Sequence, residues 1–389
     1  MIGLFWNCRG AGKKGMKTCL SHMIKDHSLD FMCLQETLKK NFLDSYFRKL
    51  DPYNLFEWEW IPSIGKAGGI LCGVRKEKFE VVAWRKGRFI LQVSLYDINM
   101  KKIWTLCSVY GAAHEGDKND FLSELADFCC HIQTPLLIGG DFNILRHDGE
   151  KNKRWRRTAH SDLFNSIINT MCLSETYMSG GTYTWSNNQA HPTLEKLDRV
   201  LMSNEWEEMF PMVNMKKLVR EVSDHNALLL YSDNHVIRAP QKREFRFEMS
   251  WLKSEDFIPL VSKIWNQNVN ATDPVDILNI KLKRFKKFFK GWGSSNFGHE
   301  KKRKQEIREE LALIEKAEEE GTIDDEMFCR KTDLLVEMNE ILVNEELFLL
   351  QQSNERWLLG GIVTPLTTKK LLTVISGKTR YILFMWGMQ

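Results

Sequence analysis

Short apolar runs recur through residues 1–234, and only a few of the segments between them have helical spacing. The runs predict strands over Gly3–Trp6, Phe31–Gln35, Gly69–Val74, Phe89–Leu95, Ile103–Tyr110, Leu136–Gly139, Tyr183–Trp185, Leu197–Met202 and Leu228–Tyr231. Helical spacing predicts helices over Lys17–His27, Asp120–His131 and Ser161–Met171. Many strands with few helices between them favour two packed sheets flanked by helices over a strict β-α-β winding. We therefore expect one α/β sandwich over residues 1–234.

The pattern changes after this sandwich. Residues 235–275 form a linker-like stretch that contains Pro240. Two later sets of apolar residues recur at helical spacing, with an acidic stretch between them: Ile307, Leu311 and Ile314, and then Leu334, Met338, Ile341 and Leu342. They predict an α-helical hairpin over residues 276–358, whose role could be purely that of a spacer. Residues 359–389 follow as an atypical tail.

Composition narrows the class of protein. The 389 residues are 43% hydrophobic and 27% charged, as in soluble globular proteins. No run approaches the roughly 20 apolar residues of a membrane span, and the N-terminal segment lacks the features of a secretory signal. The nine cysteines include no Cys-x-x-Cys pair, which disfavours a disulfide framework or a zinc site. We expect a nuclear or cytoplasmic protein with no membrane partner, and a net charge of +4 permits nucleic acid as a partner.

Polar side chains stand at the ends of several predicted strands. Paired glycines after a buried strand allow a sharp turn that brings Asp141 and Asn143 to the rim of a sheet. Asn7 follows the first predicted strand, and Glu36 follows the second. Mg²⁺ prefers carboxylate oxygen and keeps several waters, so one strand-end glutamate can serve as its main protein ligand. Taken singly, Asp141 and Asn143 are equally typical of a turn, Asn7 is more typical of a turn, and Glu36 is more typical of an exposed acid.

A second group of polar residues lies farther along the chain. Tyr110 closes a strand, where its phenol can hydrogen-bond phosphate or simply pack in the core. Asp198 stands inside a strand-like apolar stretch, and a carboxylate there needs a hydrogen-bonding or charged partner. Asp224-His225 precedes another strand and supplies that partner. A histidine oriented by a carboxylate can act as acid, base or charge stabiliser near neutral pH.

Six strings carry these residues between positions 6 and 225: W-N-x-R-G, L-Q-E-T, S-V-Y-G, G-G-D-F-N, L-D-R-V and S-D-H. In this order they resemble the motifs of the endonuclease/exonuclease/phosphatase superfamily. The resemblance implies a four-layer α/β sandwich, in which two mostly antiparallel sheets are flanked by helices. It also implies metal-dependent hydrolysis of a phosphoester.

A further block indicates a branch of that superfamily. The string G-T-Y-T-W-S-N at residues 181–187, followed by L-D-R-V-L-M-S at residues 197–203, resembles the endonuclease domain of plant non-LTR (LINE-type) retrotransposons. The resemblance implies that DNA is nicked to leave 3′-hydroxyl and 5′-phosphate ends. It continues into the hairpin, which is similar to the connector before a reverse transcriptase. That domain is expected in the full-length element and is absent here.

The resemblance also implies roles for single residues. Glu36 would hold Mg²⁺, or Mn²⁺ in its place, assisted by Asn7 and Asp224. Asp141 would orient and deprotonate the attacking water. The other catalytic residues that the resemblance implies are Asn143, Tyr110 and His225 with its partner Asp198. Developing negative charge in the transition state would be met by the metal and by these donors.

The candidate DNA-binding residues include a basic segment at residues 151–157, which follows the Asp141 strand. Lys153, Arg154 and Arg156 can meet phosphates there, and Trp155 can stack on a base. A solvated loop that opens the next helix has the same composition. The other residues that we predict to bind DNA are Arg9, Thr184 and Ser223.

Three features depart from the family pattern. Arg9 stands where abasic-site endonucleases carry an aspartate, which disfavours abasic-site repair. Asn226-Ala227 follows Ser-Asp-His where a small residue and then proline are commoner. One allowed set of codons for residues 362–368 of the tail, read one base out of frame, encodes Asp-Ser-Asn-Thr-Ala-Tyr-Tyr. We therefore hypothesise that the chain ends in a frameshift and is a truncated element.

Two alternatives to a DNA-nicking enzyme remain open. The first is a phosphatase or phospholipase of the same superfamily. The second is an inactive retroelement remnant. The T-W-S-N block favours the nuclease over the first alternative, whereas the truncation keeps the second alive.

Overall fold

The computed structural model describes residues 1–65, 67–232, 257–270 and 273–360. They belong to two compact units, of which the first joins residues 1–245 to 288–343 and the second contains residues 246–287 and 344–389. Most of the predicted connector lies outside the described residues, and so does the tail from residue 361 onward. None of the described helices is long and apolar enough to cross a membrane.

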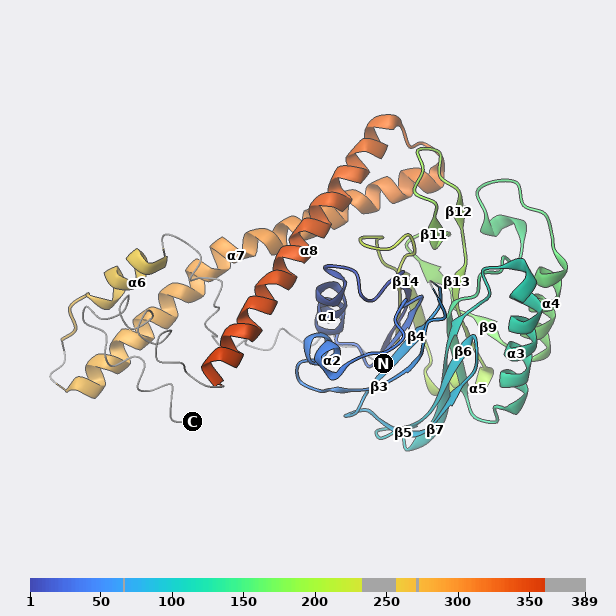
Figure 1. Cartoon of the computed structure of the whole chain (residues 1–389), viewed down its shortest axis with the longest axis horizontal. Coiled ribbons are helices and arrows are strands. Elements are labelled where there is room, and N and C mark those ends of the chain that lie inside the picture. Colours follow the sequence, from blue (N-terminus) through green and yellow to red (C-terminus); the bar gives the residue numbers. More distant parts are fainter. Residues whose placement is uncertain (66, 233–256, 271–272, 361–389) are drawn as a thin grey trace. The chain divides into compact units, whose positions relative to one another are not determined.

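Two sheets form the centre of the first unit (Figure 1). The first contains β1 (Ile2–Asn7), β2 (Phe31–Gln35), β3 (Phe56–Ile61), β4 (Ile70–Arg75), β10 (Met178–Ser179), β14 (Val213–Lys217) and β15 (Leu228–Ser232). The second contains β5 (Phe79–Lys86), β6 (Ile90–Asp97), β7 (Lys102–Tyr110), β8 (Leu136–Asp141), β9 (Ser174–Glu175) and β13 (Asp198–Met202). A separate ribbon pairs β11 (Trp185–Ser186) with β12 (Leu194–Glu195).

The strand order is β10-β14-β15-β1-β2-β4-β3 in the first sheet and β5-β6-β7-β8-β13-β9 in the second. Most neighbours are antiparallel, and the parallel pairs are β1 with β2, β7 with β8 and β10 with β14. A hydrophobic cluster that includes Phe5, Phe31, Trp104, Leu106 and Trp206 fills the space between the sheets. Trp206 comes from α5 (Asn204–Met209).

Helices cover the outer face of each sheet. On the first sheet, α1 (Met16–Asp26) and α2 (Asp44–Leu50) pack over outward residues such as Leu4 and Leu34. On the second, α3 (Lys118–His131) and α4 (Ala159–Thr170) pack over Ile138 and its neighbours. The predicted sandwich of two mostly antiparallel sheets between helices is therefore confirmed.

The strands that the apolar runs did not predict lie mainly at sheet edges. Strands β3 and β5 are the edge strands of their sheets, and β14 lies next to the short edge strand β10. Many residues of β5 and β14 are exposed, so these strands lack a continuous apolar run. In β3, glutamates alternate with tryptophans in a half-buried strand. Apolar runs identify strands that are buried on both faces, so they do not identify edge strands with an exposed face.

The predicted helical hairpin is formed by α7 (Pro274–Glu320) and α8 (Asp325–Gly360), and the turn between them begins at Gly321, whose φ is 70°. Within the first unit the hairpin is part of the protein core rather than a spacer. Its apolar residues Ile307, Leu311, Leu334 and Met338 share one buried cluster with residues of β1 and α1. The second unit contains α6 (Phe257–Trp265) and the remaining parts of α7 and α8.

Candidate active site

Strand pairing brings the predicted residues to one edge of the sandwich. In the second sheet Tyr110, Asp141 and Asp198 stand side by side on three neighbouring strands, because Asp141 is in register with both of the others. In the first sheet Asn7 ends β1 beside the end of β2, and Glu36 follows that end. The Asn7 amide donates a hydrogen bond of 2.8 Å to Asp141 Oδ2 and so links the two sheets.

Asp141 lies at the centre of this edge and is 1% exposed. The Asn143 backbone N–H donates to Asp141 Oδ1 at 3.0 Å, and the Asn143 side chain donates to Oδ2 at 3.2 Å. Asn143 adopts a φ of 52°, which asparagine tolerates better than most residues. A Cβ on Gly140 would lie 2.2 Å from the Val109 carbonyl oxygen, so this close strand pair requires glycine there.

His225 completes a buried group with the two aspartates, which we call the Asp–Asp–His cluster (Asp141, Asp198 and His225). His225 Nδ1 lies 2.8 Å from Asp198 Oδ2, and Nε2 lies 3.9 Å from Asp141 Oδ2. Thr184 supports this group because its hydroxyl oxygen accepts a hydrogen bond of 3.0 Å from the backbone N–H of Asp198. Thr184 is fully buried, so the prediction that it contacts DNA is not supported.

The environment changes the acidity of the cluster. Burial raises the pKa of Asp141 to about 7, although the nearby His225 opposes the shift. Burial alone would lower the pKa of His225, but Asp198 and Asp141 outweigh it and raise that pKa to about 9. Burial, together with the charges of Glu36 and Asp141, also raises the pKa of Tyr110. Near neutral pH the site therefore holds a weakly acidic carboxyl group, an imidazolium and a neutral phenol.

The three residues predicted to hold a metal lie beside this cluster. The Asn7 amide donates to Glu36 Oε2 at 3.2 Å. The Arg9 guanidinium contacts both acids: it is bonded to Asp224, and its Nε lies 3.7 Å from Glu36 Oε1. Trp185 Nε1 donates to Asp224 Oδ2 at 2.9 Å, a contact that the sequence did not indicate. Arg9 thus supplies positive charge between the two carboxylates.

Two groups of donors are candidates for a divalent cation. Ligand atoms of the Asp–Asp–His cluster lie within 4.8 Å of one another. His225 Nδ1 already bonds Asp198, which leaves Nε2 as the histidine donor of this group. Glu36 and Asp224 offer the carboxylate oxygens that Mg²⁺ prefers and are only partly buried. The donor chemistry of both groups therefore fits a hard cation, and in the second group the Arg9 guanidinium already contacts both carboxylates.

The predicted DNA-binding residues take two kinds of position. Arg154 and Arg156 are exposed between β8 and α4, Trp155 is half-buried, and Lys153 donates to the His191 carbonyl at 3.1 Å. Ser223, by contrast, donates to the Asn7 carbonyl at 2.7 Å and ties two loops of the site together. Arg154 and Arg156 are therefore accessible to a ligand, whereas the Ser223 hydroxyl is already bonded to the Asn7 carbonyl.

Two lysines near the site were missed. Lys13 and Lys14 lie between Gly12 and Gly15, in the loop that joins β1 to α1. Both are exposed and line a cavity beside Asp224. A glycine-rich basic stretch directly after a strand is a signal for phosphate contact that could have identified them.

Comparison with known proteins identifies the family. The profile of the Endonuclease/Exonuclease/phosphatase family matches residues 4–225, and the chain belongs to this family. Its fold and its buried Asp–Asp–His cluster make it a hydrolase of the phosphodiesterase type, in a family that typically uses a divalent metal. No curated protein sequence gives a significant match.

Several solved structures resemble the chain at low sequence identity. The endonuclease domain of TRAS1, a telomere-specific non-LTR retrotransposon, is 14% identical and covers 60% of this chain and 98% of its own, with a TM-score of 0.46. A 3′-5′ exonuclease from Neisseria meningitidis is 15% identical, with coverages of 60% and 100% and a TM-score of 0.49. TDP2 from D. rerio, complexed with single-strand DNA product, is 13% identical, with coverages of 59% and 97% and a TM-score of 0.43.

Proposed function

We propose that this protein is a Mg²⁺-dependent endonuclease that nicks DNA and leaves 3′-hydroxyl and 5′-phosphate ends. The observation that carries the proposal is the pairing of Asp141, whose pKa is raised to about 7, with an imidazolium at 3.9 Å. A base and a cationic donor at that separation suit attack of water on a phosphodiester.

Asp141 acts as the base. A carboxylate with a pKa near neutrality accepts a proton from water more readily than an ordinary aspartate does. Asn7 and Asn143 donate hydrogen bonds to this carboxylate and fix its direction. Their donors therefore orient the base without removing its capacity to take a proton.

His225 and Tyr110 stabilise the phosphate. Asp198 accepts from Nδ1 of His225, which leaves the Nε2–H to donate to a phosphate oxygen as its negative charge grows. Tyr110 stays neutral because its pKa is raised, so its hydroxyl remains a donor. Both groups are positioned before the reaction and need little reorganisation.

Glu36, assisted by Asn7 and Asp224, would hold the cation. When bound, Mg²⁺ or Mn²⁺ supplies positive charge that stabilises the phosphate in the transition state. The retrotransposon-like T-W-S-N block and the exposed residues Arg154 and Arg156 support DNA as the substrate. The same block supports an origin in a LINE-type element, in which the nuclease would act with a reverse transcriptase in the nucleus or cytoplasm.

The test is nicking of supercoiled plasmid in the presence of Mg²⁺, with EDTA as the control. Conversion to open circles by the wild-type protein, and loss of this conversion in Glu36→Ala and His225→Ala, would support the assignment. Intact supercoils at high concentrations of well-folded protein would overturn it. Release of phosphate from inositol phosphates, without nicking, would indicate the phosphatase alternative instead, and absence of both activities would indicate a remnant.

A further inference from the structure

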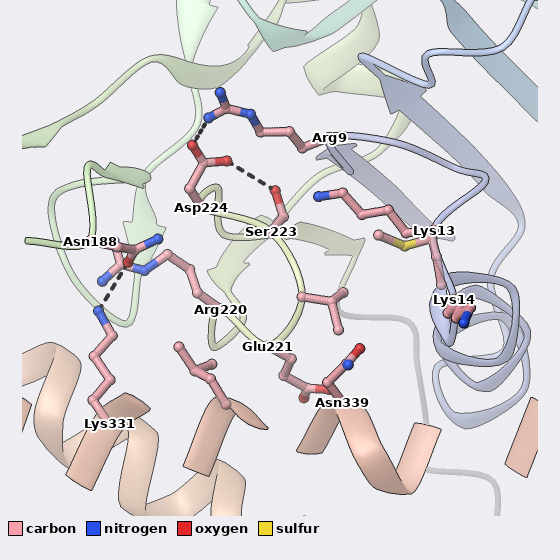
Figure 2. Close-up of a pocket in the computed structure, with 13 residues that line it drawn as sticks. Arg9, Lys13, Lys14, Asn188, Arg220, Glu221, Ser223, Asp224, Lys331 and Asn339 are labelled. Atoms are coloured by element: carbon pink, nitrogen blue, oxygen red, sulfur yellow. Dashed lines mark hydrogen bonds and ion pairs between the residues drawn. The ribbon is translucent and has the colours of Figure 1, made fainter. Parts of the chain in front are cut away.

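A cavity of about 370 Å³ opens next to Asp224, outside the Asp–Asp–His cluster. Four parts of the first unit line it: the loop from β1 to α1, the turn between β11 and β12, the loop before β15, and helix α8. Figure 2 shows Lys13 and Lys14 on one side, Lys331 and Asn188 on the other, and Asp224 with Arg9 at one end. Helix α8 lies beyond residues 4–225, which match the family profile, so this wall is an addition to the family fold.

The cavity wall is rich in positive charge. Arg9, Lys13, Lys14, Arg220 and Lys331 line it, against the two acids Glu221 and Asp224. Most of these charges are already paired within the first unit. Arg9 is bonded to Asp224, Arg220 and Lys331 both contact Glu318, and Arg308 is bonded to Glu221.

Lys13 and Lys14 are the exception. Both are exposed, and neither forms an ion pair with any residue that the structure describes. In Figure 2 the Lys13 side chain extends toward Ser223 and Asp224. The cavity therefore keeps a surplus of positive charge at its open side, a few side chains away from the proposed reaction centre. This surplus favours an anionic ligand.

The opposite wall is rigid and polar. The Lys331 ammonium donates to Asn188 Oδ1 at 3.1 Å and to Glu318 Oε1 at 2.7 Å, which fixes both Lys331 and the Asn188 loop. Asn339 lies two turns farther along α8 and exposes its amide at the rim. A preformed wall with amide groups suits hydrogen bonds to phosphate oxygens.

We propose that this cavity binds a backbone phosphate of the DNA strand that is cleaved, next to the scissile phosphate, and that helix α8 forms one wall of the DNA-binding groove. This inference rests on the proposed endonuclease function. A bound strand carries a phosphate at every nucleotide, so a strand held at Asp141 presents further phosphates to the adjoining surface. The hairpin is then part of the substrate site as well as of the core.

The test measures binding of a fluorescent DNA duplex by anisotropy in EDTA, so that cleavage does not contribute. The double variant Lys13→Ala/Lys14→Ala is compared with Lys101→Ala/Lys102→Ala, an exposed lysine pair at the far end of β7 from Tyr110. We expect the first variant to bind about tenfold more weakly and to lower the slope of log K against log salt by roughly 1 to 2, because phosphate contacts release counterions. The control should match the wild type.

Helix α8 is tested with a negative charge. Asn339→Glu at the rim of the cavity is compared with Asn344→Glu, which places the same change at an exposed position of the same helix outside the cavity wall. We expect only Asn339→Glu to weaken DNA binding. Circular dichroism melting of each variant distinguishes loss of binding from loss of fold.

The outcomes separate this inference from the proposed function. Unchanged affinity and salt slope in Lys13→Ala/Lys14→Ala, or equal affinities of Asn339→Glu and Asn344→Glu, would overturn the inference even if the wild-type protein nicks plasmid. Conversely, a wild-type protein that binds DNA through Lys13 and Lys14 but does not nick it would contradict the endonuclease assignment and leave the binding site standing.

Discussion

Two of the buried groups of charged side chains in the first unit are built differently. The Asp–Asp–His cluster holds two carboxyl groups against one histidine, and burial raises the pKa of Asp141. The interface cluster (Arg220, Glu315, Glu318 and Lys331) joins the hairpin to the loop before β15. In it two cations face two acids, with Glu318 at 2.5 Å from Arg220 and at 2.7 Å from Lys331.

This difference in charge balance indicates different roles for the two clusters. An uneven set of charges holds one proton loosely and suits proton transfer. An even set fixes geometry, and its net stabilisation is small because burying ions costs free energy. The first cluster is thus suited to reaction, and the second to holding the hairpin in register.

Asn226 connects the two clusters. It is fully buried directly after His225, and its amide donates to Glu315 Oε2 at 3.0 Å and to the Leu218 carbonyl at 2.7 Å. The family pattern has a small residue at this position, and here the hairpin supplies the acceptor that the larger side chain needs. Asn226 therefore departs from the family pattern, and its hydrogen-bond acceptor Glu315 lies beyond residues 4–225, which match the family profile.

The largest effect is expected from Asp141→Asn. An amide of the same size cannot accept the proton from water, and it loses at least one of the hydrogen bonds that the two carboxylate oxygens accept, so kcat should fall by about 10³-fold. Plasmid nicking at saturating Mg²⁺ measures the loss, and Asp120→Asn on the exposed face of α3 is the control. Activity of Asp141→Asn within tenfold of the wild type would exclude Asp141 as the base.

The interface cluster should respond in stability rather than in chemistry. Glu318→Ala leaves Arg220 and Lys331 buried beside an excess of positive charge, which should lower the free energy of unfolding by about 3–5 kcal/mol. Urea denaturation measures the change, with the exposed Glu320→Ala as the control. Equal stability of the two variants would mean that the hairpin contacts contribute little to the fold.

Asn226→Ala is expected to act on both clusters at once. Loss of its bonds to Glu315 and Leu218 frees the loop that carries His225, so kcat should fall about tenfold with little change in KM. Nicking kinetics at several DNA concentrations separate the two constants. Asn99→Ala, in the exposed turn between β6 and β7, serves as the control. A change in KM alone would contradict a positioning role.

The smallest effect is the dependence of activity on pH. Because Asp141 must lose its proton to act as a base, kcat/KM should rise as pH increases through about 7. Because His225 must keep its proton, kcat/KM should fall above about 9. In Asp198→Asn the falling limb should move to lower pH, since the Asp198 carboxylate raises the pKa of His225. A falling limb that does not move would contradict this pairing.

The sequence predicted the layers and the site edge because both depend on local patterns. Phe31–Leu34 is apolar throughout, and β2 has the predicted bounds Phe31–Gln35. Polar residues at the ends of neighbouring strands meet where those strands pair, as Asn7 and Gln35 do. The docking of the hairpin could not be predicted, because Glu318 and Arg220 read as ordinary surface charges until they are brought together. Likewise, the burial of Thr184 follows from packing of distant segments and leaves no local signal.

The shared core of the hairpin and the first sheet affects how the protein is made. Leu4 and Trp6 share a buried cluster with Leu334 and Met338, whose codons are translated long after those of β15, the last of the described strands. At about 5–20 residues per second, the roughly 110 residues between β15 and the end of the first unit take on the order of ten seconds to synthesise. Throughout that interval α1 and α2 can cover only their own part of this apolar face, and the part that the hairpin buries is open to solvent and to chaperones.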